Sequence, residues 1–439
     1  MYRYQGFLHV LHYFGLLVFI SVLNGCSYFE LARQPLPVEV KPEPITQVES
    51  HEFPLQANDS VVGQLASVPV QEGDTFSDIA RHYGLGYQHL TEANPGTEPW
   101  TPPADYRALL PLQFILPDAP RKGVVINVGA MRLFYYSNDK VITYPVGTGK
   151  EGRATPLGQM KVERKTAHPV WYVPESIRND HAKKGDPLPA SVPPGPDNPL
   201  GDFAFYLSEP SYLIHGTNKP YSIGFRASNG CIRLYPENIQ LLFDQVPEKT
   251  PVKIVNQPYL LGTLNGEPYL EAHDPYEEVN DKQAKKAMLT KLKQWEKKQK
   301  QRLDWPKIEE TLQQARGIPI PILENTPVVH QIVASAIDLE HPRRLYAQPD
   351  TEVMIKQSLW YIRVLDTVSE VSARRTAAFL NHQGPRIPAL ALSKNGRFQV
   401  IAGPYKDAKA AKTAQKRMKI DLELAGEIIP PGKEKLAME

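Results

Sequence analysis

The feature that most constrains the fold of this chain is a two-residue period of apolar side chains that begins at Lys122. Runs rich in Val, Ile, Tyr and Phe alternate with short segments that contain Gly, Asn or Asp, which is typical of strands joined by turns. These runs cover residues 124–128, 131–136, 141–146, 159–165 and 252–255. The period therefore predicts a mostly β domain in the middle of the chain.

A candidate nucleophile lies within this predicted domain. The chain has 2 cysteines, and Cys231 follows Gly230 in a turn of small residues, with His215 upstream. A thiolate is a nucleophile and an imidazole can take its proton, while the Gly230 and Cys231 amides could hold an oxyanion. A lone cysteine can equally be a small buried hydrophobe. The cation Arg233 favours acyl chemistry on a substrate that carries a carboxylate.

The residues around this cysteine resemble the signature of the L,D-transpeptidase family of peptidoglycan enzymes. The matching runs are His215-Gly216-Thr217, Ile223-Gly224 and Ser228-Asn229-Gly230-Cys231-Ile232-Arg233-Leu234. Residues 155–158, Thr-Pro-Leu-Gly, are similar to another family hallmark. Many members of the family have a second histidine where this chain has Asn229, so the base is assigned to His215.

The resemblance implies a mostly β sandwich or barrel and a cysteine acyltransferase activity. Cys231 would attack the meso-diaminopimelate carbonyl of a tetrapeptide stem and expel D-Ala, after which an amine would attack the thioester. His215 would act as the base, oriented by the Gly216 carbonyl, and the Gly230 and Cys231 amides would hold the oxyanion. The resemblance places the substrate-binding residues at Arg233, Ser228, Asn229 and Thr217. No metal and no cofactor are expected.

The acceptor stays open at this point. A second diaminopimelate would give 3–3 crosslinks, a lipoprotein lysine would give wall attachment, and water would make the protein an L,D-hydrolase that detaches lipoprotein. A wall-binding scaffold with an inactive central domain is the alternative from another class. A net charge of +2 disfavours nucleic acid as a partner.

The N-terminus indicates export. Residues 14–23 are an apolar run that is too short to span a bilayer, and residues 1–26 are typical of a signal peptide. Residues 23–26, Leu-Asn-Gly-Cys, resemble a bacterial lipobox, which implies lipidation of Cys26. The protein is therefore expected in the periplasm, anchored in the outer membrane of a Gram-negative bacterium. An uncleaved membrane anchor is the alternative.

Two further modules are expected around the catalytic domain, which is assigned to residues 122–256. Residues 27–66 are rich in proline and predict an extended linker. Residues 67–118 have a capping box at Thr75 and Asp78 and resemble a βααβ LysM module, which binds glycan strands of peptidoglycan. A small structural domain without glycan affinity is the alternative.

The C-terminal part is expected to hold a helical linker and a second wall-binding module. Residues 257–357 form an extension whose basic helix, 281–303, could pack on the protein or bind a membrane surface. Residues 358–431 predict the order βαββαβ and resemble a ferredoxin-like, α+β SPOR domain that binds peptidoglycan glycan. A protein-interaction domain is the alternative.

One long loop is expected to cover the site. Residues 180–202 are rich in Pro and Gly and show no period. Because structureless segments of this length are uncommon inside a domain unless they act as lids or binding loops, we expect this segment to lie over the active site.

Overall fold

The computed structural model describes residues 51–345, 356, 358–383 and 386–433. The signal segment 1–26 with Cys26, the linker up to residue 50 and residues 346–355 lie outside the described part. Within that described part, no helix combines the length and the apolar composition needed to cross a bilayer.

The catalytic domain is built on a nine-stranded sheet with the order β1-β8-β7-β6-β17-β10-β13-β14-β16. The pairs β17–β6 and β14–β16 are parallel, and the other neighbours are antiparallel. The strands are β1 (His51–Pro54), β6 (Gly123–Asn127), β7 (Arg132–Ser137), β8 (Lys140–Pro145), β10 (Gly158–Ala167), β13 (Phe203–Leu207), β14 (Leu213–His215), β16 (Ile232–Arg233) and β17 (Pro251–Val255). The mostly β fold expected from the two-residue period is confirmed.

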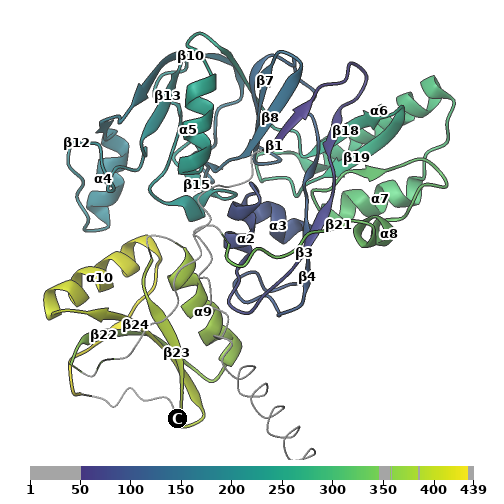
Figure 1. Cartoon of the computed structure of the whole chain (residues 1–439). Helices are drawn as coiled ribbons and strands as arrows, with labels where there is room; N and C mark the ends of the chain where they lie inside the picture. Colours follow the sequence, from purple (N-terminus) through teal and green to yellow (C-terminus); the bar gives the residue numbers. More distant parts are fainter. Residues whose placement is uncertain (1–50, 346–355, 357, 384–385, 434–439) are drawn as a thin grey trace, which may run out of the picture. The chain divides into compact units, whose positions relative to one another are not determined.

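Both faces of this sheet are buried, each in a different core. Val124, Ile126 and Leu133 pack into one cluster, together with Ile239 and Leu242 of helix α5 (Pro236–Gln245). Figure 1 shows α5 lying against β13 and β10. On the opposite face, the alternate residues of β6, β7 and β8 join the core of the LysM-like module, and they are Val125, Phe134, Tyr136 and Val141.

The predicted linker 27–66 is wrong in its described part, because residues 51–66 contain two paired strands, β1 and β2 (Val61–Gly63). β1 pairs with β8 at the edge of the catalytic sheet, with His51 opposite Thr143. β2 pairs with β5 (Gln113–Ile115). Val61 is buried in one hydrophobic cluster, and Phe53 is partly buried and packs against another. The segment is therefore part of the folded domain.

The LysM-like module has the expected βααβ order. Its elements are β3 (Ala66–Pro69), α2 (Phe76–His82), α3 (Tyr87–Ala93) and β4 (Arg107–Leu110). The expected capping box is confirmed in part: Thr75 Oγ1 accepts from the Asp78 amide at 3.1 Å, but the Asp78 carboxylate accepts from the Thr75 hydroxyl, at 2.8 Å. Within the module β3 pairs with β4, whereas β5, at residues 113–115, pairs with β2.

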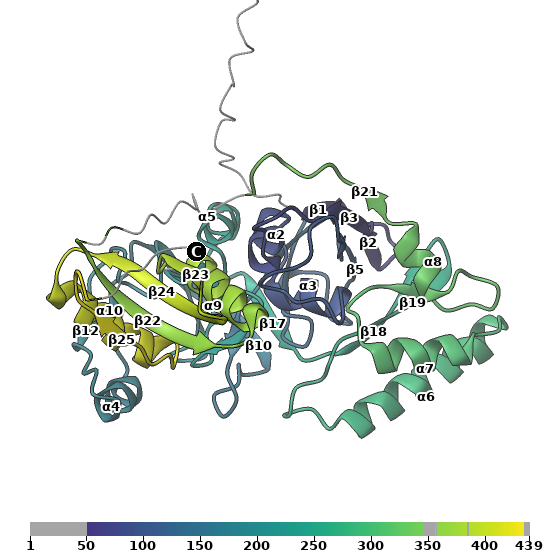
Figure 2. The ribbon, with the colours of Figure 1, turned by 90° about the horizontal axis from the view of Figure 1, so that it is seen from below.

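The extension after residue 256 is a packed region and not a linker. A three-stranded sheet, β18 (Tyr259–Leu264), β19 (Glu267–Ala272) and β20 (Ile320–Pro321), lies with helices α6 (Asp281–Gln299) and α7 (Trp305–Gln314), as Figure 2 shows. Met288 and Leu292 of α6 are buried in the shared core. The basic helix therefore packs on the protein. Helix α8 (Val329–Ala334) and strand β21 (Ile337–Asp338) follow.

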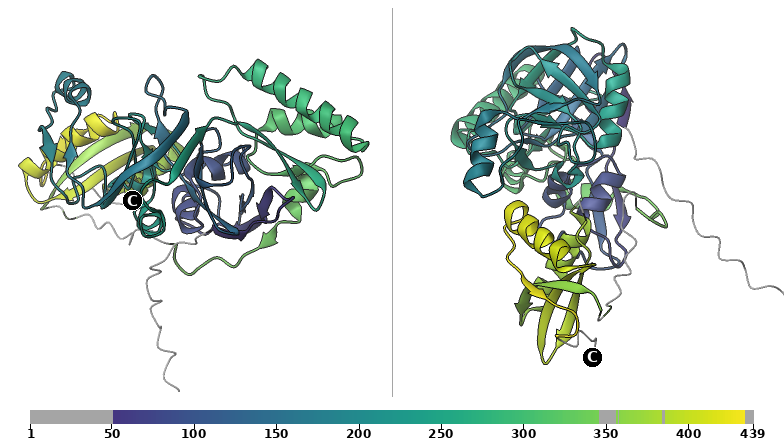
Figure 3. Two further views of the ribbon diagram at one scale, coloured as in Figure 1. Left: turned by 90° about the horizontal axis from the view of Figure 1, so that it is seen from above. Right: turned by 90° about the vertical axis from the view of Figure 1, so that its left-hand side faces the viewer.

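The SPOR-like module forms a four-stranded antiparallel sheet of order β23-β24-β22-β25 with two helices. Its elements are β22 (Trp360–Thr367), α9 (Glu370–His382), β23 (Ala389–Lys394), β24 (Arg397–Tyr405), α10 (Ala408–Asp421) and β25 (Glu427–Ile429). Figure 3 shows both helices, drawn in yellow-green and yellow, against the sheet. The expected order βαββαβ is confirmed. Ala373, Ala377 and Leu380 form the inner face of α9, whereas Val371 is 62% exposed.

Candidate active site

Strand pairing brings the two signature motifs together. β14 and β16 are parallel neighbours, with Ile214 opposite Ile232 and His215 opposite Arg233. The Leu234 amide donates to the His215 carbonyl at 2.9 Å. Because Cys231 directly precedes β16, the register of two short strands fixes the candidate nucleophile close to the candidate base.

The turn that carries Cys231 is held by one hydroxyl. Ser228 Oγ donates to the Cys231 carbonyl at 2.6 Å and accepts from the Gly230 amide at 3.0 Å. Gly230 has a φ of +109°, and a Cβ there would lie 2.7 Å from the Tyr212 ring. Only glycine fits this turn without strain. Ser228 is the last residue of strand β15 (Arg226–Ser228), and β15 pairs with β9 (Thr148–Gly149).

The imidazole of His215 is oriented by the backbone. His215 is buried, and its Nδ1 donates to the Gly216 carbonyl at 2.6 Å. This bond leaves Nε2 as the basic nitrogen. A Cβ on Gly216 would lie 3.1 Å from Ile239 and 3.3 Å from the Leu200 carbonyl, so the close packing of this loop favours glycine. The expected role of the Gly216 carbonyl matches this geometry.

Burial sets the protonation of both groups. Burial and, to a smaller extent, the nearby Arg233 cation lower the pKa of His215 to about 3, against the opposing effect of backbone hydrogen bonds to Gly216 and Leu200. Burial also raises the pKa of Cys231 above its usual range, against the opposing effect of Arg233. At neutral pH the pair is therefore a neutral thiol and a neutral imidazole, and a neutral imidazole can accept a proton.

The thiol contacts a backbone carbonyl at rest. Cys231 Sγ donates to the Ser211 carbonyl at 3.7 Å, a long contact that a small rotation of the side chain would break. The Gly230 amide, which was expected to bind an oxyanion, is already bonded to Ser228. Within residues 51–345, 356, 358–383 and 386–433, the Cys231 amide has no acceptor, so it is the better candidate donor.

Arg233 lines the same cavity as Cys231 and His215, with a volume of about 730 Å³. Its Nε is buried and, among the described residues, has no hydrogen-bond partner. A buried guanidinium nitrogen without a partner is costly, and a carboxylate would satisfy it. This observation fits the expected contact of Arg233 with an anionic donor.

Of the other two predicted substrate-binding residues, Asn229 is exposed and Thr217 is buried. Asn229 is exposed at the cavity. Thr217 is buried, and its Oγ1 accepts from the Lys219 amide at 2.9 Å, so it shapes the loop that ends in the short 3₁₀ helix η1 (Pro220–Ser222).

The loop over the site is partly regular, which corrects the expectation of a structureless segment. The end of helix α4 (Glu175–Lys183) covers its first residues, and β12 (Ser191–Val192) pairs with β11 (Trp171–Tyr172). Every residue of α4 is at least partly exposed, so no apolar stripe marked this helix in the sequence.

Asn198 organises this loop and was missed by the sequence argument. It is fully buried, and its amide nitrogen donates to the Pro169 carbonyl at 2.8 Å while its oxygen accepts from the Leu200 amide at 2.9 Å. An asparagine among prolines in residues 193–199 is the one signal that could have indicated it.

Comparison with known families identifies the three modules. The L,D-transpeptidase catalytic domain matches residues 121–254, the LysM domain residues 69–99 and the SPOR domain residues 356–430. These matches confirm the resemblances drawn from the motifs.

Curated relatives agree. A probable L,D-transpeptidase ErfK/SrfK of Escherichia coli is 44% identical over 230 residues, which are 51% of this chain and 74% of that protein. A protein of the same name from Salmonella typhimurium is 38% identical over 287 residues, 63% of this chain and 92% of that protein. A probable L,D-transpeptidase YbiS of Escherichia coli is 40% identical over 230 residues, 51% and 75% of the two chains. This chain therefore belongs to the L,D-transpeptidase family.

Proposed function

We propose that this peptidoglycan L,D-transpeptidase forms an acyl-enzyme at Cys231 with tetrapeptide stems and transfers the acyl group to an amine. The observation that carries the proposal is the β14–β16 register, which sets His215 opposite Arg233, two residues after Cys231. All three residues line one cavity.

The first step forms the thioester. Cys231 leaves the Ser211 carbonyl and gives its proton to His215 Nε2, while Sγ bonds to the diaminopimelate carbonyl. The Cys231 amide stabilises the oxyanion. The tetrahedral intermediate then collapses, the bond to D-Ala breaks, and His215 returns its proton to the departing amine. Arg233 holds a carboxylate of the donor.

The second step releases the product. An acceptor amine attacks the thioester carbonyl and gives a proton to His215, and Sγ leaves and regains a proton. The imidazole is neutral at rest, because burial lowers the pKa of His215, and a neutral Nε2 can accept this proton. The acceptor proposed is a diaminopimelate amine, which gives 3–3 crosslinks, with a lipoprotein lysine as the second choice.

The proposed location of the protein in the cell supports an amine acceptor in the mature cell wall. We place the protein in the periplasm, with Cys26 lipidated in the outer membrane and the segment that follows it as a tether. Two modules of wall-binding families flank the catalytic domain and hold it at glycan strands. Labelling cells with a palmitate analogue tests the anchor: a Cys26→Ser variant should lose the label.

Incubation with purified sacculi tests the acceptor. Separation of the muropeptides by mass should show new dimers of tetra-tri type, with Cys231→Ala as the inactive control. Lipoprotein-linked tripeptides without new dimers would favour attachment. Stems shortened to tripeptides, or lipoprotein released from the wall, with no new bond would contradict an amine acceptor and make the protein a hydrolase.

A further inference from the structure

The cavity that contains Cys231 is not made by the catalytic domain alone. Cys231, His215 and Arg233 line one side, and residues of the SPOR module line another. Five of the SPOR residues are apolar or aromatic, namely Ile387, Pro388, Tyr405, Ala414 and Leu422, and four are polar or charged, namely Gln383, Arg386, Arg417 and Asp421. A volume of about 730 Å³ lies within the usual range for a ligand site, and such sites are commonly apolar with a few polar groups.

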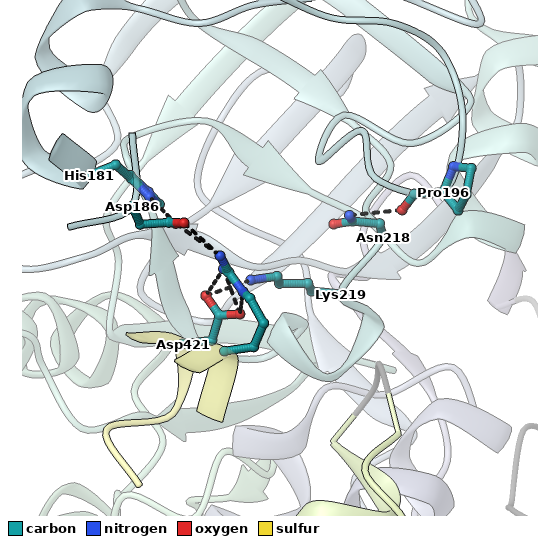
Figure 4. A network of polar contacts seen from close by, with 7 residues as sticks. His181, Asp186, Pro196, Asn218, Lys219 and Asp421 are labelled. Carbon is teal, nitrogen blue, oxygen red and sulfur yellow. Dashed lines mark hydrogen bonds and ion pairs between the residues drawn. The ribbon is translucent and has the colours of Figure 1, made fainter. Parts of the chain in front are cut away.

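One arginine holds this wall in place. Arg417 of α10 donates through Nη1 to both oxygens of Asp186, at 2.9 and 3.0 Å. Its Nε and Nη2 donate to Asp421 one turn along, at 3.0 and 2.6 Å. Asp421 lies 3.8 Å from Lys219 of the loop after β14, as Figure 4 shows together with Asp186 and His181. Three segments around the cavity are thus joined by one group of charges.

These charges are paired with each other and are poorly suited to bind a ligand. All three guanidinium nitrogens of Arg417 donate to carboxylates. Asp186 also contacts His181 at 3.1 Å. Burial raises the pKa of Asp186, but hydrogen bonds from His181 and Arg417 outweigh it and the net pKa is lowered. The side chain of Asp186 is 14% exposed and that of Arg417 is 42% exposed, so the pair is only partly screened by water.

The SPOR module has other contacts that do not involve the cavity wall directly. His382 of α9 bonds to Asp78 of α2, and the Phe379 ring packs edge-on against Trp100 at 5.1 Å. Breaking the Arg417 contact would therefore loosen the wall beside Cys231 without removing every attachment of the module.

We propose that the SPOR module forms a wall of the transpeptidase substrate site and that Arg417, bonded to Asp186, is the positioning residue that holds it there. This inference rests on the proposed function at Cys231. The apolar wall would pack against the methyl and methylene groups of a stem peptide, whose carboxylate meets Arg233. The module then contributes to peptide affinity and does not only bind glycan.

Charge reversal tests the contact in the full-length protein. Arg417→Asp and Asp186→Arg each place like charges together, and each should raise the KM for a soluble disaccharide-tetrapeptide at least about fivefold, with kcat within about twofold. The double variant restores opposite charges and should recover most of the affinity. Arg374→Ala is the matched control, because Arg374 pairs only with Glu370 in its own helix at 2.8 Å among the described contacts.

Two further readouts separate the possible failures. Thermal melting shows whether each variant is folded, and alkylation of Cys231 by iodoacetamide reports whether the thiol is intact. If the single variants gain turnover, the SPOR module is a cover and not a binding wall; if KM does not change, the contact is passive. Either result overturns the proposal. A wild-type protein that alkylates but never turns over the stem would instead contradict the proposed function.

Discussion

The two sides of the active-site cavity are built in different ways. The inner side rests on strand pairing: β14 and β16 fix His215 and Arg233, and the buried Ser228 hydroxyl fixes the turn at Cys231. The outer side consists of α4, the loop after it and the SPOR module, joined by ion pairs whose side chains are partly exposed. Buried, satisfied polar groups hold a geometry firmly, whereas exposed ion pairs contribute only about 1 kcal/mol or less.

This difference suggests that the two sides contribute to different steps, the inner side to the reaction and the outer side to peptide binding. The inner side holds the reacting groups in place before the substrate arrives, which is what transition-state stabilisation requires. On the outer side, loss of an ion pair would loosen the wall that contacts the peptide without moving the reacting groups. Changes on the inner side should therefore affect kcat, and changes on the outer side should affect KM.

The largest effect is expected from His215→Ala. Without the imidazole the thiol has no base, so kcat should fall at least about 1000-fold, measured with a soluble tetrapeptide. Asn229→His is the control, since it restores the second histidine found in many relatives, and it should change kcat less than about threefold. A large gain from Asn229→His would show that the base is not complete in this chain.

The rate at which Cys231 is alkylated should depend strongly on pH, because the Cys231 thiol and the His215 imidazole are both neutral at rest. Because burial raises the pKa of Cys231, the thiolate fraction, and so the rate of alkylation by iodoacetamide, should increase about tenfold per pH unit from about pH 6 to about pH 8. The low pKa of His215, about 3, means that no imidazolium stabilises the thiolate near neutral pH. A Cys26→Ser background leaves one thiol to follow. A rate that is already level at about pH 6 would indicate a preformed thiolate–imidazolium pair.

A smaller effect is expected on the outer side. Arg153 pairs with Asp180 of α4, with side chains 30% and 45% exposed. Arg153→Ala should raise KM about two- to fivefold and leave kcat unchanged, because the pair is worth at most about 1 kcal/mol. Lys140→Ala, which removes a surface pair with Glu52, is the control and should change neither constant. A kcat lowered more than about tenfold by Arg153→Ala would mean that α4 positions the reacting groups.

Local patterns in the sequence predicted most of the elements. The two-residue period gave β6, β7, β8, β10 and β17, and the order of the SPOR module came from its alternating strands and helices. The signature residues could be predicted because the motif and the chemistry of Cys231, His215 and Arg233 agree. These features depend on neighbours along the chain or on the signature itself.

Features that depend on distant packing could not be predicted. β1 joins the catalytic sheet because His51–Pro54 pairs with residues 140–143. The proline-rich composition of residues 27–66 gave no sign of this strand. The commitment of the Gly230 amide to Ser228 depends on a side-chain rotamer. The contact between Arg417 and Asp186 joins residues 231 positions apart, and no local pattern marks either of them.

The central claim is that Cys231 carries the acyl group. Intact-mass measurement of the protein mixed with a disaccharide-tetrapeptide tests it most directly. The account predicts a mass increase equal to the donor without its terminal D-Ala, mapped to Cys231, and no increase in Cys231→Ala. An adduct that persists in the Cys231→Ala variant, or one that maps to another residue, would contradict the account.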